Sequence, residues 1–192
     1  MTVELHLAQD AEADRLLSDN PLALVIGMVL DQQIPLEKAF SSPAELVRRI
    51  GGPLDAATIA RMDPGELGAL FKERPALHRF PGSMAKRTHA LCQHLVDEYG
   101  GDAGAVWRGV TSGDELYARL VALPGFGAEK AKIFQALLAK RLEVRPDGWE
   151  RAAAPFSDDT PRSVADIDSP ETLARVRDWK RTQKRHGWGK AD

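Results

Sequence analysis

The spacing of hydrophobic positions predicts a chain that is helical almost throughout. Apolar side chains recur at helical spacing in most segments, and no segment shows convincing strand alternation. No internal repeat or low-complexity tract interrupts the pattern. We therefore expect an all-α fold, with a helical hairpin and further helices over residues 11–17, 22–30, 35–40, 44–50, 55–61, 64–71, 84–99, 103–110 and 170–184.

One helix is predicted to form the centre of the core. The run Leu22–Leu30, LALVIGMVL, is apolar on nearly every side, which is typical of a buried helix. Asn20 is a good capping residue and Pro21 suits the first helical position, so the helix should begin there. It ends in the polar residues 31–33, DQQ, which a core helix would carry to the surface.

Proline and glycine mark the other helix boundaries. Because proline lacks an N–H donor and its ring clashes with a preceding turn, Ser42-Pro43 is expected to separate the helices over 35–40 and 44–50. Gly51-Gly52 and Gly100-Gly101 are expected to stop the helices that precede them. The stretch after the hairpin, residues 144–161, is expected to be irregular.

The helical hairpin is predicted over Val121–Lys132, VALPGFGAEKAK. Asp114 is expected to cap its first helix, and Pro124 prevents that helix from continuing. Gly125 and Gly127 allow backbone conformations with positive φ, so a connection of about four residues can join the two helices.

The hairpin has a geometry that suits an anion. The amides of Gly125 and Gly127, with that of Ala128 opening the second helix, are expected to point outward, and a helix N-terminus favours negative charge. A nucleic-acid phosphate would be positioned there without its sequence being read. The alternative is that the two glycines form only a turn.

Bulk charge gives no general attraction to nucleic acid. The net charge is −2 over 192 residues, so DNA binding would have to come from local basic patches. The segment Arg175–Lys190 is one such patch, although it is equally compatible with a solvated helix end; it contains Arg175, Arg177, Lys180, Arg181, Lys184, Arg185 and Lys190 against Asp178 alone.

Cysteine and histidine usage limits the cofactors. The single Cys92 excludes an intramolecular disulfide and a four-cysteine iron–sulfur cluster. The histidines have no metal-ligand spacing, so no zinc site is expected. No apolar stretch could span a membrane and residues 1–10 lack a signal pattern, so we expect a cytoplasmic protein that associates with the nucleoid when bound to DNA.

The sequence LPGFGAEKA resembles the helix-hairpin-helix signature of the HhH-GPD DNA glycosylase superfamily, whose members include endonuclease III and the alkylpurine glycosylases. In that family a loop and an aspartate follow the hairpin, and Asp147 stands at the matching distance from Glu129. The resemblance implies a two-lobed fold with a cleft between the lobes, lobe A over about 35–123 and lobe B over about 1–34 plus 124–192. It also implies a monomer that binds double-stranded DNA with a damaged base.

Asp147 is the candidate catalytic residue. Cleaving a base from deoxyribose creates a cationic, oxocarbenium-like sugar, which a nearby carboxylate stabilises while it orients water. The base must leave the stack to reach such a group. The local sequence also fits an Asp147 that only caps a helix or forms an Asx-turn, and Trp149 would either line the base pocket or pack in the core.

Two other segments resemble DNA-contacting parts of the family. In VLDQQ, Gln33 matches a glutamine that approaches the DNA near the target base, because an amide can both donate and accept; Gln32 is a further pocket candidate. The alternative is that both glutamines bond the backbone at the helix end. In RFPGSMAKR, Lys86 and Arg87 would contact phosphates, and wedge candidates are Phe80, Pro81 and Met84, with Phe80 favoured as a core residue.

The resemblance also bears on the reaction. Bifunctional members carry a lysine where Glu129 stands, and Lys130 lies on another face of the helix, so it is assigned only a DNA contact. Backbone carbonyls matching a monovalent-cation site are those of Val121, Leu123 and Phe126. We expect a monofunctional DNA glycosylase without an iron–sulfur cluster; the alternative is a non-catalytic DNA-binding or damage-sensing protein of the same fold.

Overall fold

The structure, a computed structural model, describes residues 4–189 and confirms the all-α prediction. Within this range there is no β-strand, and an isolated bridge joins Ser112 and Asp147. The α-helices are α1 Ala11–Asp19, α2 Pro21–Leu30, α3 Leu36–Ile50, α4 Ala56–Arg61, α5 Pro64–Lys72, α6 Pro81–Tyr99, α7 Gly113–Val121, α8 Ala128–Arg141, α9 Trp149–Ala153 and α10 Pro170–His186, and the 3-10 helices are η1 Ala103–Val106 and η2 Val164–Asp166.

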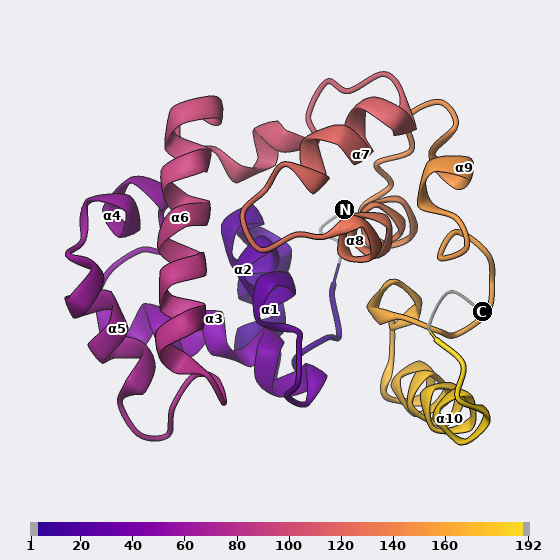
Figure 1. Ribbon diagram of the computed structural model, residues 1–192, viewed down its shortest axis with the longest axis horizontal. Coiled ribbons are helices and arrows are strands. Elements are labelled where there is room, and N and C mark those ends of the chain that lie inside the picture. Colours follow the sequence, from indigo (N-terminus) through magenta and orange to yellow (C-terminus); the bar gives the residue numbers. More distant parts are fainter. Residues whose placement is uncertain (1–3, 190–192) are drawn as a thin grey trace.

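The helices form three groups across the molecule, and the group that comes first in the chain lies in the middle (Figure 1). Helices α4 and α5 pack on α6 at one end, and α1 and α2 pack on α3 in the middle. At the other end α8 packs on α7, α9 and η2, with α10 beyond η2. The division into two lobes with a cleft between them remains a prediction.

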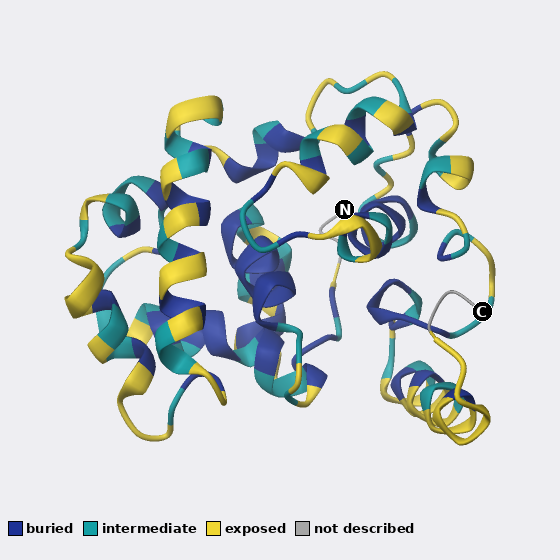
Figure 2. Ribbon diagram, in the orientation of Figure 1, coloured by how far each residue is buried: buried dark blue, intermediate teal, exposed yellow. Residues whose placement is uncertain are grey.

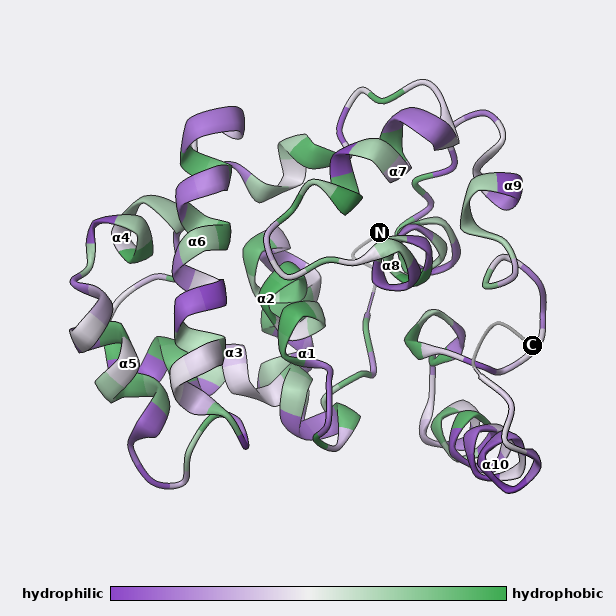
Figure 3. Cartoon of the chain, in the orientation of Figure 1, coloured by the Kyte–Doolittle hydropathy of each residue, from purple (hydrophilic) through white to green (hydrophobic). Residues whose placement is uncertain are grey.

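Helix α2 forms the centre of the core, as its uniformly apolar sequence predicts. Every residue from Leu22 to Leu30 is buried (Figure 2), and the Asn20 side chain accepts hydrogen bonds from the first turn. A Cβ added at Gly27 would lie 2.6 Å from the Phe40 ring, so glycine here allows α3 to pack closely. Figure 3 shows the contrast between the hydrophobic α2 and the hydrophilic α10.

Tertiary packing overrides several predicted boundaries. The expected break at Ser42-Pro43 is wrong: α3 is continuous, and the Ser42 hydroxyl donates to Lys38 O at 2.7 Å inside it. Helix α7 is capped by Ser112 instead of Asp114, since Ser112 Oγ accepts from the Glu115 amide. Helix α6 begins at Pro81, earlier than expected.

The stretch expected to be irregular, residues 144–161, contains one short helix. This helix is α9, whose Ala153 is fully buried, and η2 follows the stretch. Over residues 4–189 none of the helices is long and apolar enough to cross a membrane.

Candidate nucleic-acid interface

The hairpin forms as predicted, with a longer connection. Residues 122–127 join α7 to α8. Gly125 has φ +90°, and a Cβ there would lie 3.1 Å from the Val29 side chain, so both its conformation and its packing on α2 require glycine. Gly127 differs from the expectation, because its φ of −102° is extended backbone that any residue adopts.

Gly127 instead leaves an open surface at the start of α8. It is the N-cap residue, α8 has no side-chain cap, and a Cβ at Gly127 would meet no atom within 4 Å. Gly127 and Ala128 are exposed, and no acceptor among residues 4–189 bonds their amides. The first turn of α8 therefore presents donors and partial positive charge to solvent, which suits a phosphate.

The carbonyls assigned to a cation lie in and beside this turn. Leu123 O accepts a hydrogen bond from the Phe126 amide at 3.0 Å, and the Phe126 ring packs edge-on against Phe134 with ring centroids 5.5 Å apart. A carbonyl oxygen has a second lone pair, so this bond leaves Leu123 able to bind a cation. The cation site at Val121, Leu123 and Phe126 stays a prediction.

The Lys130 side chain is predicted from the sequence to contact a DNA phosphate, but it points to the backbone of α2. Its Nζ donates to Met28 O at 2.5 Å and lies 3.3 Å from Val29 O, across from α8 to the end of α2. A cation at a helix C-terminus stabilises the carbonyls that have no partner in the helix. Lys130 thus fixes α8, and with it the hairpin, to the C-terminal end of α2.

The residues after α2 form an exposed loop with unusual backbone. Gln33 has φ +56°, which is uncommon for a residue with a Cβ and costs of order 1 kcal/mol or more. Its side chain is exposed, and the side-chain amide makes no hydrogen bond to any of residues 4–189. The predicted backbone-satisfying role therefore applies to Gln32 alone, and Gln33 keeps an amide available for DNA.

Gln32 connects this loop to α6. Its Nε2 donates to Val29 O at 2.9 Å and lies 3.7 Å from Met84 Sδ, while its Oε1 accepts from Arg87 Nη1 at 3.0 Å. Met84 is only 3% exposed, so the expectation that it could act as a wedge is wrong. Lys86 and Arg87 are exposed, as phosphate contacts require.

Phe80, favoured from the sequence as a core residue, is instead 43% exposed at the start of α6. The Arg79 guanidinium lies over its ring, 5.3 Å from the centroid. The buried neighbour His78 holds this segment: its Nδ1 accepts from the Phe80 amide at 2.9 Å. Burial lowers the pKa of His78 below its usual value, so the ring is neutral at pH 7.

Asp147 is fixed by its backbone and leaves its carboxylate unused. Its amide donates to Thr111 O at 3.0 Å, and its carbonyl accepts from the Gly113 amide at 2.8 Å. Helix α9 has no side-chain cap, and no donor among residues 4–189 bonds the Asp147 carboxylate, so it neither caps a helix nor forms an Asx-turn. Asp147 is exposed.

Trp149 follows Asp147 as the first residue of α9. It is half-buried against the hydrophobic core, which favours the core alternative over a freely placed pocket residue. A Cβ at Gly113 would lie 2.7 Å from Trp149 Cα, so α9 packs tightly on the start of α7. The side-chain amide of Gln135 in α8 donates to Gly113 O at 3.0 Å, so α8 also contacts the start of α7.

The structure thus brings together three of the four predicted segments. The hairpin turn contacts Val29 through Gly125, the Gln32–Gln33 loop continues from α2, and the start of α6 reaches that loop through Arg87. Asp147 lies at the opposite end of α7 from the hairpin turn, and 9 helical residues span about 13 Å. The hairpin turn and Asp147 are therefore separated by the length of α7.

Comparison with protein families identifies the chain. A family model described as HhH-GPD superfamily base excision DNA repair protein matches residues 26–187. The chain belongs to the HhH-GPD superfamily. No curated protein gives a significant match. The family places this HhH-GPD protein in base excision DNA repair, with DNA as its partner.

Sequence reasoning missed the role of His78, because two of its partners, Leu30 and Gln32, lie 48 and 46 residues away along the chain. Cys92 is inert by contrast, since burial raises the pKa of its thiol to about 12.

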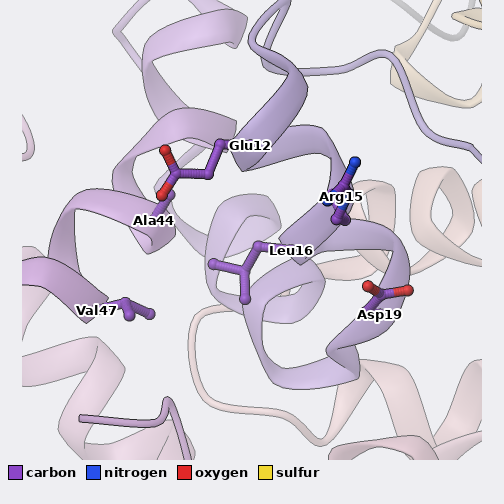
Figure 4. Close-up of a pocket in the computed structure, with 6 residues that line it drawn as sticks. All are labelled: Glu12, Arg15, Leu16, Asp19, Ala44 and Val47. Atoms are coloured by element: carbon purple, nitrogen blue, oxygen red, sulfur yellow. The ribbon is translucent and has the colours of Figure 1, made fainter.

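A hollow of about 250 Å³ between α1 and α3 (Figure 4) has none of the predicted DNA-contacting residues in its lining. The basic helix α10 is exposed over most of its length, and Lys190 lies outside the described residues.

Proposed function

We propose that this HhH-GPD protein is a monofunctional DNA glycosylase, which hydrolyses the N-glycosidic bond of a damaged or mismatched base in double-stranded DNA. Asp147 would stabilise the oxocarbenium-like sugar and orient the attacking water. The observation that carries the proposal is the Asp147 carboxylate: the backbone of Asp147 makes two hydrogen bonds, yet the carboxylate makes none within residues 4–189.

The DNA would be held by groups with separate tasks. The exposed amides of Gly127 and Ala128 suit a phosphate and would bind every sequence alike. Gln33 and Phe80 are exposed on neighbouring loops and suit insertion into the stack once the target base has left it. We assign the wedge to Phe80 in place of the buried Met84.

Strand cleavage is not part of the proposed reaction. A lyase needs an amine that forms a Schiff base with the sugar, and the position where bifunctional members carry a lysine holds Glu129. Lys130, the neighbouring amine, donates to the carbonyls of Met28 and Val29. The product would be an intact strand with an abasic site.

One observation favours the alternative, a protein that binds damaged DNA without cleaving it. Asp147 is exposed, whereas a carboxylate stabilises a developing cation most strongly where water is excluded. Catalysis therefore requires the bound DNA and the extruded base to cover Asp147.

Base release decides between the two functions. Duplexes with single alkylated, oxidised, deaminated or mismatched bases are incubated with the protein, and the released bases are identified by mass spectrometry. The proposed function requires release of at least one base, with alkali needed to cleave the strand. Lesion-selective binding without release on every substrate would favour the alternative, and a borohydride-trapped covalent adduct would contradict the monofunctional assignment.

A further inference from the structure

The inference concerns the buried His78 and rests on the proposed DNA-inserting face. His78 is 3% exposed and lies between the end of α2 and the start of α6. Its Nε2 is 3.2 Å from Leu30 O and 3.0 Å from Gln32 O, and its Nδ1 is 2.9 Å from the Phe80 amide nitrogen. One imidazole ring therefore bonds the backbone of both loops that carry the exposed Gln33 and Phe80.

The chemistry of these bonds fixes the tautomer. A backbone amide can only donate, so Nδ1 must accept from Phe80 and the ring proton must be on Nε2. That proton is shared between the two carbonyl oxygens, of Leu30 and Gln32. Both ring nitrogens are thus used, and the planar ring sets the separation between the two loops.

The two loops have few other direct links. Gln32 adds one, since its Oε1 accepts from Arg87 of α6 and its Nε2 contacts Met84. These bonds are side chain to side chain, and the one to Arg87 is exposed, whereas the His78 side chain is buried and its bonds end on backbone. Because Gln33 has a strained φ of +56°, it depends on its neighbour Gln32 being held in place.

We propose that His78 is a positioning residue that couples the Gln33 loop to Phe80, so that the amide and the aromatic ring enter the DNA stack as one unit. The gap left by an extruded base must be filled while the adjacent step is unstacked, and both events cost free energy. Holding the two groups in their inserted arrangement before binding lowers the entropy cost of ordering them.

Three substitutions separate the two halves of the link. His78→Phe keeps the ring but removes both polar contacts. His78→Gln places its amide nitrogen at the same number of bonds from Cβ as Nε2 of the histidine, so it restores the donor to Leu30 and Gln32. His78→Asn places its amide oxygen at the same number of bonds from Cβ as Nδ1, so it restores the acceptor for the Phe80 amide. The matched control is His89→Phe on α6, because His89 Nε2 also bonds a backbone carbonyl, Met62 O at 3.1 Å, but contacts neither loop.

The probe is a duplex with a tetrahydrofuran abasic-site analogue and 2-aminopurine in the opposite strand, which fluoresces when unstacked. It needs no catalysis. With the unsubstituted protein we expect fluorescence to rise on binding. His78→Phe should lose most of that rise and about tenfold in affinity, the scale of one stacking contact, while affinity for an undamaged duplex changes by less than about twofold.

Coupling is tested by a mutant cycle. Gln33→Ala and Phe80→Ala should have non-additive effects on affinity for the abasic duplex, and these should become additive in the His78→Phe background. His78→Gln and His78→Asn should each recover part of the fluorescence rise. The thermal unfolding of every variant is measured, and the comparison with His89→Phe separates a loss of stability from a loss of positioning.

The outcomes are distinct. Normal fluorescence and affinity in His78→Phe, or loss of both in His89→Phe in proportion to stability, would overturn the positioning role. An unsubstituted protein that leaves 2-aminopurine stacked would overturn it together with the insertion face. If the unsubstituted protein gives the fluorescence rise and His78→Phe loses it, but no base is released from any damaged duplex, the glycosylase assignment is overturned and the role of His78 stands.

Discussion

At the scale of single residues, Asp147 makes the proposed chemistry testable without damage to the fold. Its carboxylate is exposed and bonds no donor within residues 4–189, so Asp147→Asn should change the free energy of unfolding by less than about 0.5 kcal/mol. Base release should fall by about 10²–10³-fold, while DNA affinity stays equal or rises because a negative charge is removed. Single-turnover release and a binding titration measure the two effects.

The control for that substitution is Asp114→Asn. Asp114 is also exposed at the start of α7, where it pairs with Arg151 at 2.5 Å. It shares the charge and the neighbourhood of Asp147 but not its unbonded carboxylate. Equal rates of release from both variants would show that Asp147 has no special part in the reaction.

His78 gives a second residue-scale prediction, on pH. Burial holds its pKa below 6.5 in the folded protein, and the nearby cations Lys130 of α8 and Arg87 of α6 act in the same direction. As pH falls through 6.5, the unfolded chain binds the proton first, so the free energy of unfolding decreases until the folded pKa is passed. Denaturant titrations should show this decrease in the unsubstituted protein, with a smaller one in His78→Gln; equal slopes would contradict the assignment.

At the scale of elements, the two hairpin glycines have different reasons to be glycine. Gly127 has open space where a Cβ would lie and serves as the N-cap of α8. Gly127→Asn should keep stability, since asparagine is a good N-cap, but should place a side chain where a phosphate would bind. We expect affinity for all duplexes to fall alike, by about tenfold or more, because a phosphate contact does not read sequence.

Gly125 provides the contrast within the same turn. With φ +90° and Val29 at 3.1 Å from a Cβ, Gly125→Ala should destabilise the fold by more than about 1 kcal/mol. Denaturant unfolding and fluorescence-anisotropy binding separate the two variants. Unchanged DNA affinity in Gly127→Asn would remove the hairpin from the interface.

At the scale of the whole molecule, a net charge of −2 leaves DNA affinity to local patches such as α10. Arg177 of this helix pairs with Glu37 of α3, which ties α10 to the element that follows the Gln33 loop. Lys184 and Arg185 are exposed in its last turn. Lys184→Gln with Arg185→Gln should reduce the slope of log affinity against log salt by about 1–2, since each phosphate contact contributes about 0.9.

The matched control is Arg48→Gln. Arg48 is an exposed arginine on α3 that pairs with Glu12 and Glu45. Its loss should leave the salt slope unchanged. A slope that is also unchanged in the α10 variant would make that helix a solvated surface with no part in DNA binding.

Local patterns determined much of this fold. The apolar run of α2, its Asn20 cap and the hairpin signature over Val121–Lys132 each act within a few residues, through propensity, capping and turn chemistry, so the sequence alone specifies them. The family also follows from such local motifs, together with the spacing to Asp147.

Only the tertiary structure decided which of the predicted DNA-contacting side chains are exposed. Met84 is buried and Phe80 exposed, although both are apolar residues in one segment, because the end of α2 packs against the start of α6, where Gln32 contacts Met84 and His78 bonds Leu30. Lys130 bonds the carbonyl of Met28 in α2, which lies 102 residues away in the chain. His78 and Leu30, which are also in contact, are 48 residues apart. Contacts at such separations depend on how the helices pack, so no local pattern contains them.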